Sequence, residues 1–136
     1  MKYCIKHTSP SVQDFDKLRA NVGWGHIDLN MAQQSLKNSL FHVTVYIENE
    51  LIGMARVIGD GVMYFYIQDL VVIKSYQNKG IGKILMTEVE KYLAKSAKKG
   101  ATIALLAAQG KESFYTRYDY IERSGDPFGK AMCKFF

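Results

Sequence analysis

The residues best placed to do chemistry lie in one short stretch, residues 77–83, with the sequence QNKGIGK. It follows a strongly apolar run and precedes a helical pattern, so we expect it to join a strand to the start of a helix. The first turn of a helix has unsatisfied N–H groups and a partial positive charge, and it attracts anions. Gly80 and Gly82 would let a phosphate approach the backbone, and Lys79 and Lys83 add positive charge. These features predict a pyrophosphate site.

Two other phosphate-binding motifs do not fit the same stretch. A dinucleotide-binding fingerprint requires a third glycine where Leu85 stands, and it also requires an acidic residue about twenty positions further on. A Walker loop requires a glycine where Gln77 stands and a serine or threonine where Ile84 stands. One alternative stays open, because both glycines could serve only the packing of a tight turn between strand and helix.

The hydrophobic periodicity around this stretch predicts an α/β (α+β) fold. We expect a mixed, mostly antiparallel central sheet of about six to seven strands with about four helices, in a single domain over residues 1–136. The predicted strands cover residues 2–7, 41–48, 51–58, 62–73, 101–108, 120–123 and 130–136. The predicted helices begin at Val12 behind the N-cap Ser11, after Asn30, within the QNKGIGK stretch and at Lys111. The run over 101–108 has the composition of a central strand covered on both faces.

Composition and charge narrow the class of protein. The chain has 136 residues, 48% of them hydrophobic, and a net charge of +5, which suits anionic partners. The lysines form no single block, so we favour a solvated helix face over a nucleic-acid surface. Two cysteines without a Cys-x-x-Cys spacing favour neither a disulfide framework nor a metal site. No run is long enough for a membrane helix, and no signal peptide is recognised, so we predict a cytoplasmic protein.

The spacing Gln77-x-x-Gly80-x-Gly82 resembles the Q/R-x-x-G-x-G/A signature of the GCN5-related N-acetyltransferases, the GNAT superfamily. Three further segments fall where that family has related motifs: LIGMARVIGDG, YIQDLVV and the late SFYTRYDY. The order of predicted elements also matches, and the resemblance covers residues 12–120. It implies a transferase that moves an acetyl group from acetyl-CoA to a primary amine by direct attack in a ternary complex.

The resemblance also implies which residues hold acetyl-CoA. The amides of the signature loop would wrap the pyrophosphate, and the pantetheine arm would lie along the preceding strand as an extra strand. The amide of Val72 would polarise the thioester carbonyl. The implied cofactor-binding residues are Leu70, Val71, Val72, Gln77, Asn78, Lys79, Gly80, Ile81, Gly82 and Lys83.

Two residues are implied or considered as catalytic. Tyr115 matches the family's usual general acid, which protonates the departing CoA thiolate, and Tyr118 is a lesser rival. Asp119 stands where the family pattern has glycine, so the local turn departs from that pattern. Asp69 is the only carboxylate in its strand and is a candidate general base. An equal alternative is a structural Asp69 that is hydrogen-bonded to the backbone or to Arg56 across the hairpin.

The acceptor would be recognised between the first two helices, where we single out Trp24, His26 and Asp28. Trp24 also has a structural alternative as a helix-end core plug, and His26 has one as an exposed loop residue. The apolar terminal run makes a homodimer a reasonable expectation. We expect neither nucleic acid nor a membrane as a partner, and no metal. A sensor that binds acyl-CoA without turnover is the alternative function, and a small basic nucleic-acid-binding domain is a weaker one.

Overall fold

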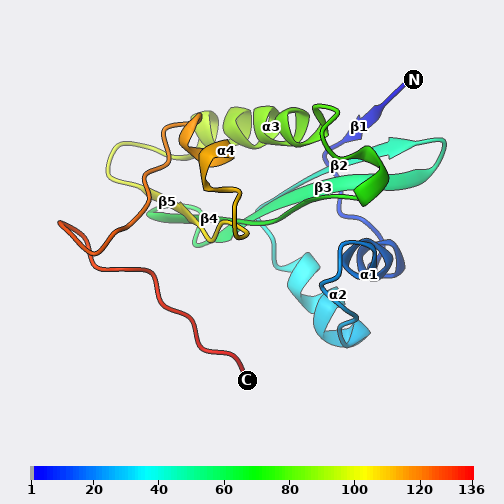
Figure 1. Ribbon diagram of the computed structural model, residues 1–136, viewed down its shortest axis with the longest axis horizontal. Coiled ribbons are helices and arrows are strands. Elements are labelled where there is room, and N and C mark those ends of the chain that lie inside the picture. Colours follow the sequence, from blue (N-terminus) through cyan, green and yellow to red (C-terminus); the bar gives the residue numbers. More distant parts are fainter. Residues whose placement is uncertain (1) are drawn as a thin grey trace. The chain divides into compact units, whose positions relative to one another are not determined.

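The computed structural model describes residues 2–136, which form two compact units, one ending at Leu105 and the other running from Leu106 to Phe136. The first unit holds a five-stranded sheet in the order β1-β2-β3-β4-β5 (Figure 1). Its strands are β1 (Cys4–Lys6), β2 (Phe41–Ile47), β3 (Glu50–Gly59), β4 (Tyr64–Val72) and β5 (Thr102–Leu105). Its helices are α1 (Val12–Asn21), α2 (Leu29–Lys37), the 3-10 turn η1 (Lys74–Tyr76) and α3 (Ile81–Ser96).

The sheet is mixed and mostly antiparallel, as predicted. Strands β1 to β4 pair antiparallel in chain order, which is the meander expected from the tight turns. Strands β4 and β5 run parallel, and α3 forms the crossover that a parallel pair requires. The QNKGIGK stretch therefore lies where the chain leaves β4 and enters the crossover helix.

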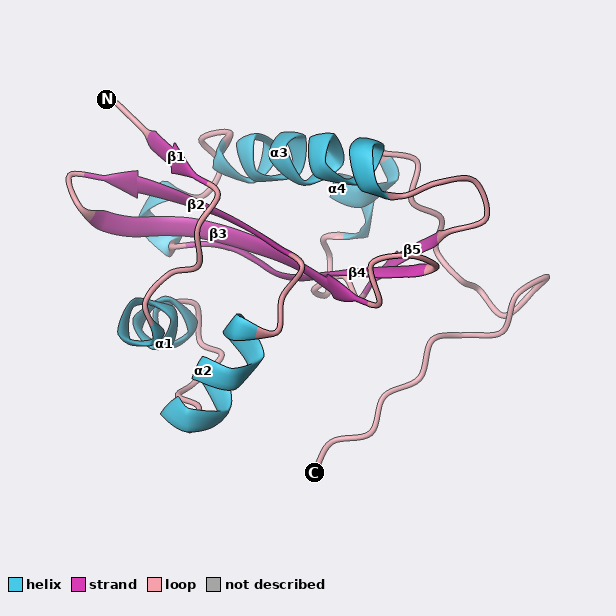
Figure 2. Ribbon diagram, turned by 180° about the vertical axis from the view of Figure 1, so that it is seen from behind, coloured by secondary structure: helices cyan, strands magenta, loops and turns pink. Residues whose placement is uncertain are grey.

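Helices cover both faces of the sheet in the first unit. Figures 1 and 2 show α3 along one face and α1 with α2 below the other. The face of α3 turned to the sheet is apolar and buried, with Ile81, Leu85, Met86, Val89 and Leu93. Gly53 of β3 lies beneath the start of this helix, and a Cβ there would stand 3.1 Å from Ile81 Cγ2 and 3.3 Å from Leu85 Cδ1. A residue without a side chain thus lets α3 begin close to the sheet.

The two helices of the other face begin at side-chain caps. Ser11 accepts a hydrogen bond from the Asp14 N–H at 3.1 Å, which confirms the predicted cap of α1. Asp28 accepts from the Met31 N–H at 2.9 Å, so α2 begins at Leu29, before the position predicted after Asn30. A carboxylate at this N-cap satisfies a free amide and also suits the positive end of the helix dipole.

The sheet has fewer strands than predicted. Strand β5 covers only Thr102–Leu105, alternates between exposed and half-buried residues, and lies at the edge of the described sheet. The prediction of a central strand over 101–108 was therefore wrong. The physical reason is that α3 packs over β2, β3 and β4, and leaves β5 outside the layer it covers.

The two terminal strands predicted over 120–123 and 130–136 are also absent from the described residues. The second unit contains α4 (Glu112–Thr116), and residues 121–136 are exposed coil. An apolar run forms a strand only where a neighbouring edge accepts its backbone hydrogen bonds, and the composition of residues 130–136 could not show whether one exists. Phe114 makes edge-on ring contacts with Tyr115 at 5.1 Å and Tyr118 at 5.7 Å inside this unit.

Candidate functional site

The two halves of β4 differ in their partners. From Tyr64 to Ile67 the strand pairs with β3 on one side and with β5 on the other. The recorded pairs with β5 end at Ile67 and Leu105, while β4 continues to Val72. Within the unit that ends at Leu105, the edge of residues 68–72 has no strand against it. An extended ligand could pair with this edge as an added strand.

A β-bulge separates these halves. Met54 of β3 is opposite Val71 and Arg56 is opposite Gln68, so Ala55 alone faces two residues of β4, Asp69 and Leu70. Asp69 has a φ of 57°, in the left-handed region that aspartate tolerates better than most residues. A bulge bends its strand and changes the direction of the backbone groups that follow. Here those groups belong to residues 70–72.

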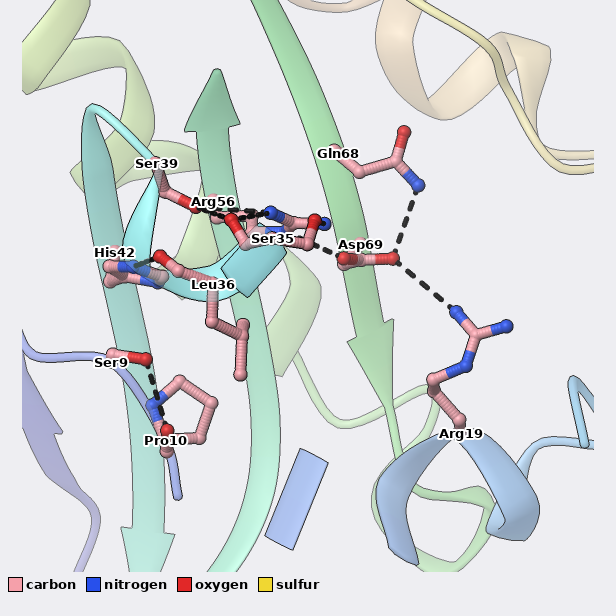
Figure 3. A network of polar contacts seen from close by, with 10 residues as sticks. All are labelled: Ser9, Pro10, Arg19, Ser35, Leu36, Ser39, His42, Arg56, Gln68 and Asp69. Carbon is pink, nitrogen blue, oxygen red and sulfur yellow. Dashed lines mark hydrogen bonds and ion pairs between the residues drawn. The ribbon is translucent and has the colours of Figure 1, made fainter. Parts of the chain in front are cut away.

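Asp69 is buried at the bulge between two arginines. Its side chain is 1% exposed, and its Oδ2 accepts a hydrogen bond from Arg56 Nε at 2.7 Å. Its Oδ1 lies 3.9 Å from Arg19 Nη1 and accepts from Gln68 Nε2 at 3.1 Å (Figure 3). Both carboxylate oxygens are therefore engaged. The geometry is that of the structural alternative for Asp69, the ion pair across the hairpin.

The same arginine also reaches α2. Arg56 Nη1 donates to the Ser35 carbonyl at 2.9 Å and to Ser39 Oγ at 3.0 Å, and Nη2 donates to Ser35 Oγ at 3.0 Å. His42 of β2 donates from Nε2 to the Leu36 carbonyl at 2.9 Å (Figure 3). Burial holds the pKa of His42 below its usual value, which favours the neutral ring. The end of α2 is thereby attached to both β2 and β3.

The loop after β4 presents unpaired amides at the start of α3. Gln77 donates from its side-chain amide to the Val72 carbonyl at 2.8 Å, which ties the loop back to the end of the strand. Asn78 has a φ of 61°, and Gly80, the N-cap of α3, has a φ of 85°. Gly80 cannot cap with a side chain, so the N–H groups of the first helical turn have no side-chain partner.

The space at this helix start fits an anion. A Cβ added to Gly80 would meet no atom within 4 Å, so the space beside the backbone is open. The side chains of Lys79 and Lys83 are exposed, and Lys79 Nζ lies 5.3 Å from the centre of the Tyr76 ring. Uncapped amides, a positive helix end and two lysines together suit a pyrophosphate.

Tyr115 lies on α4 in the second unit. Its side chain is 9% exposed, and burial raises the pKa of its phenol above the ordinary value of 10.0. A phenol is already protonated at neutral pH with its ordinary pKa, and the shift does not change this; the protonated form is the one that a general acid requires. Tyr118, the rival acid, is half-buried in the same unit.

The three predicted acceptor residues lie at the connection between α1 and α2. Trp24 is 41% exposed, and the Arg19 guanidinium lies 5.6 Å from its ring centre. His26 donates from Nδ1 to Asp16 at 2.7 Å, and this hydrogen bond is the main cause that lowers the pKa of Asp16. Asp28 caps α2. All three therefore have intramolecular contacts, and Trp24 also presents an exposed face.

A surface cavity of about 400 Å³ lies elsewhere in the first unit. It is lined by α1, by the turn between β2 and β3, and by Ile73 at the end of β4. Its polar lining consists of Asp14, Lys17, Asn21, Glu48, Asn49 and Glu50. None of the three predicted acceptor residues lines this cavity.

Sequence reasoning missed several contributors to the site. Arg19 was not singled out, although it stacks on Trp24 and approaches Asp69. Ser35 and Ser39 carry no motif, and only their spacing of one helical turn hints at a shared partner. Gly53 was not singled out either, although a glycine inside a predicted strand is a signal of close approach by another element.

Residues 2–136 contain neither a metal-binding cluster nor a membrane-spanning helix. No three side chains among the histidines, cysteines, aspartates and glutamates there are grouped in a way that could hold a metal ion. Within that same range, no helix combines the length and apolar character needed to cross a membrane.

Similarity to known proteins agrees with this geometry. Residues 16–136 match the model of the acetyltransferase (GNAT) domain family. An uncharacterized ycf52-like N-acetyltransferase from Prochlorococcus marinus is 35% identical over 108 residues, which are 75% of this chain and 58% of that protein. This chain thus spans less than two thirds of that relative's length.

Two solved structures are similar over nearly all of both chains. One, from methicillin-resistant Staphylococcus aureus, is described as a probable acetyltransferase; it has a TM-score of 0.89 and 31% identity, covering 98% of this chain and all of that one. The other, a GNAT family acetyltransferase from Streptococcus pneumoniae, has a TM-score of 0.78 and 28% identity, covering 98% of each. The resemblance seen in the signature loop is confirmed, and the chain belongs to the GNAT acetyltransferase family.

Proposed function

We propose that this chain transfers the acetyl group of acetyl-CoA to a primary amine. The observation that carries the proposal is the edge of β4 at residues 68–72, which has no strand against it within the unit that ends at Leu105 and is followed, after η1 and the loop, by the start of α3 without a side-chain cap. An extended chain with a pyrophosphate at one end is complementary to such a surface, because the edge offers backbone hydrogen bonds and the helix start attracts the anion. Acetyl-CoA has this form.

In this proposal the amides of residues 77–83 bind the pyrophosphate, and backbone groups of Leu70 and Val72 pair with the pantetheine arm. The tie between Gln77 and the Val72 carbonyl supports it, since it fixes the loop relative to the strand end. The Val72 N–H would stabilise the negative charge that develops on the thioester oxygen. Val71, buried on the other side of the strand, holds the edge in place.

The chemical step proposed is direct attack in a ternary complex. The neutral amine forms a bond to the thioester carbon, the C–S bond breaks, and Tyr115 gives its proton to the departing thiolate. The amine loses one proton to water, and water returns a proton to the Tyr115 phenolate, so the side chain ends as it began. Asp69 fits the role of base less well than its structural role, because both of its oxygens are occupied by Arg56 and Gln68. Holding both substrates in line supplies much of the rate.

The proposal is less specific for the acceptor than for acetyl-CoA. We place the acceptor near Trp24, His26 and Asp28, and the exposed face of Trp24 is the feature that supports this. A cytoplasmic location, a homodimer and the absence of nucleic-acid binding stay predictions from the sequence.

The experiment that tests the cofactor site is thermal unfolding with and without acetyl-CoA. Ligand at a hundred times its Kd stabilises the folded state by about 2.7 kcal/mol, which corresponds to a rise in Tm of roughly 8–14 °C at this chain length. Gly82→Asp should abolish the rise, because it places a carboxylate against the pyrophosphate. Thr87→Asp is the matched control, since it adds the same charge on an exposed position further along α3. No rise in the wild type would refute the proposal.

The general acid is tested by Tyr115→Phe beside Tyr118→Phe. We expect the first to lower kcat by about a hundredfold or more, with little change in acetyl-CoA affinity, because only proton donation is lost. Tyr118→Phe should leave kcat near the wild-type value. Full turnover of Tyr115→Phe across pH 6–9 would show that Tyr115 is not the general acid. A large loss of kcat in Tyr118→Phe would assign the role of general acid to Tyr118. Binding without turnover for any amine would favour the sensor instead.

A further inference from the structure

The buried carboxylate at the bulge connects the two sides of the proposed reaction. Asp69 lies in β4, directly before the residues proposed to hold the thioester. Its partner Arg56 also holds the end of α2, and its other neighbour Arg19 belongs to α1. The two helices that border the proposed acceptor region are therefore linked to the cofactor strand through one side chain (Figure 3).

We propose that Arg56 and Asp69 are positioning residues, which hold the β4 bulge in the form that binds the acyl-CoA arm and fix α2 to it. This inference rests on the proposed function. It assigns the pair a role in affinity for the cofactor, beyond a contribution to stability.

The burial and the hydrogen-bond pattern support a positioning role. The Arg56 side chain is 8% exposed and that of Asp69 is 1% exposed, so neither can exchange its partner for water. The guanidinium makes four hydrogen bonds: one to Asp69 at the bulge, two to Ser35 of α2 and one to Ser39 just beyond that helix. Only its planar fork can serve both sides at once. Replacing buried ion pairs by apolar residues often keeps or raises stability, so stability alone does not explain this pair.

The ion pair can stabilise the unusual backbone conformation at Asp69. A φ of 57° is costly for most residues, and the ion pair fixes the side chain of the residue that adopts it. Without the pair, the bulge is free to move to a neighbouring position along β4. The reason is that a bulge is one extra residue in a strand, and by itself it does not fix the register of the two strands. The backbone groups of Leu70 and Val72 would then lose their alignment with the ligand.

The test compares Asp69→Asn, Arg56→Gln and the double variant. Asparagine tolerates the left-handed conformation, so Asp69→Asn removes the charge while the backbone stays accessible. We expect each single variant to weaken acetyl-CoA binding by roughly tenfold, and the double variant to be no weaker than either single, because all three lose one shared interaction. Binding is measured by calorimetry at a temperature where circular dichroism shows each variant folded. Arg56→Lys, which keeps the charge but cannot span both partners, replaces any variant that does not fold.

Thr44→Val is the matched control. Thr44 is also fully buried in the sheet, and its hydroxyl lies within hydrogen-bond distance of the Lys6 carbonyl at 3.3 Å and the Thr8 carbonyl at 3.4 Å, so its side-chain partners belong to neither α2 nor β4. It should lower Tm without changing the Kd for acetyl-CoA. If the Arg56 and Asp69 variants behave in the same way, losing Tm but keeping Kd within twofold of wild type, the positioning role is wrong.

A second readout needs no ligand. Amide hydrogen exchange should accelerate together at residues 67–72 of β4 and at residues 35–39, the end of α2 and the turn after it, in Arg56→Gln, and in neither segment in Thr44→Val. Faster exchange in one segment alone would overturn the coupling between them. A wild type that does not bind acetyl-CoA refutes the proposed function, whereas a binding wild type with unaffected variants refutes only the positioning role. A loss of kcat confined to Asp69→Asn, with Kd unchanged, would return Asp69 to the role of base.

Discussion

The two halves of β4 show how one strand can serve both stability and binding. The half from Tyr64 to Ile67 has a strand on each side and alternates regularly, with Phe65 and Ile67 buried. The half from Gln68 to Val72 contains a bulge, carries a buried carboxylate and is paired only with β3 within its unit. The first half has the regular pairing and the regular alternation of buried residues that are typical of an ordinary strand. The second departs from them where the proposed ligand would bind, and such local departures are typical of functional sites.

The largest expected effect comes from the regular half. Phe65→Ala removes a ring that is 2% exposed and packs edge-on to Tyr92 at a centroid distance of 6.4 Å. Truncation of a buried Phe costs about 3–5 kcal/mol, which corresponds to a fall in Tm of roughly 9–26 °C. The additional rise in Tm on adding acetyl-CoA should match that of wild type, as measured by thermal unfolding. A lost rise would contradict the division of roles between the two halves.

A smaller effect is expected just beyond the open half. Gly80→Ala forces a side chain into a φ of 85°, at a cost of about 1–2 kcal/mol, although no atom lies within 4 Å of the new Cβ. Gly100→Ala is the matched control, because Gly100 has a φ of 99° and equally open space. Thermal unfolding should show similar losses of Tm. Calorimetry should show weaker acetyl-CoA binding only in Gly80→Ala, and equal binding would mean that the open space at Gly80 is not used.

The smallest effect is a pH dependence at the turn that begins the regular half. Asp60 Oδ1 accepts hydrogen bonds from the N–H groups of Val62, Met63 and Tyr64 at 2.8–3.0 Å, and these bonds lower the pKa of the carboxyl below 3.8. A lowered folded-state pKa stabilises the fold above the unfolded value, and the contribution disappears as pH falls through the folded value. The Tm difference between wild type and Asp60→Asn should thus be present at pH 7 and shrink as the pH falls below 3.8 and through the folded-state pKa of Asp60. If the Tm difference persisted unchanged at pH 2, its cause would be something other than the charge of Asp60.

The sequence alone predicted the regular parts of the molecule well. The meander and the long helix follow from periodicity, and the signature loop follows from two glycines at a strand end, because each of these depends on residues close in sequence. The missing terminal strands over 120–123 and 130–136 depend instead on whether a distant edge is available. A run such as residues 130–136 carries no information about that.

The candidate site likewise has parts that the sequence alone predicts and parts that it does not. The loop from Gln77 to Lys83 could be read from spacing, and so could the possibility that Asp69 pairs with Arg56. The bulge could not, since one extra residue in β4 leaves the apolar pattern of the strand almost unchanged. The link from Arg56 to Ser35 and Ser39 joins residues about twenty apart through an arginine that resembles any other strand arginine.

The bulge has a consequence for how the hairpin forms. Strands β3 and β4 are neighbours in sequence, so their pairing closes only a short loop and belongs to the fast events of folding. If β4 slipped by one residue against β3, Arg56 would enter the interior without its carboxylate, and an unpaired buried charge is strongly unfavourable. The ion pair between Arg56 and Asp69 thus favours one register of the hairpin. Only the alignment that places Ala55 opposite Asp69 and Leu70 gives Arg56 its carboxylate partner.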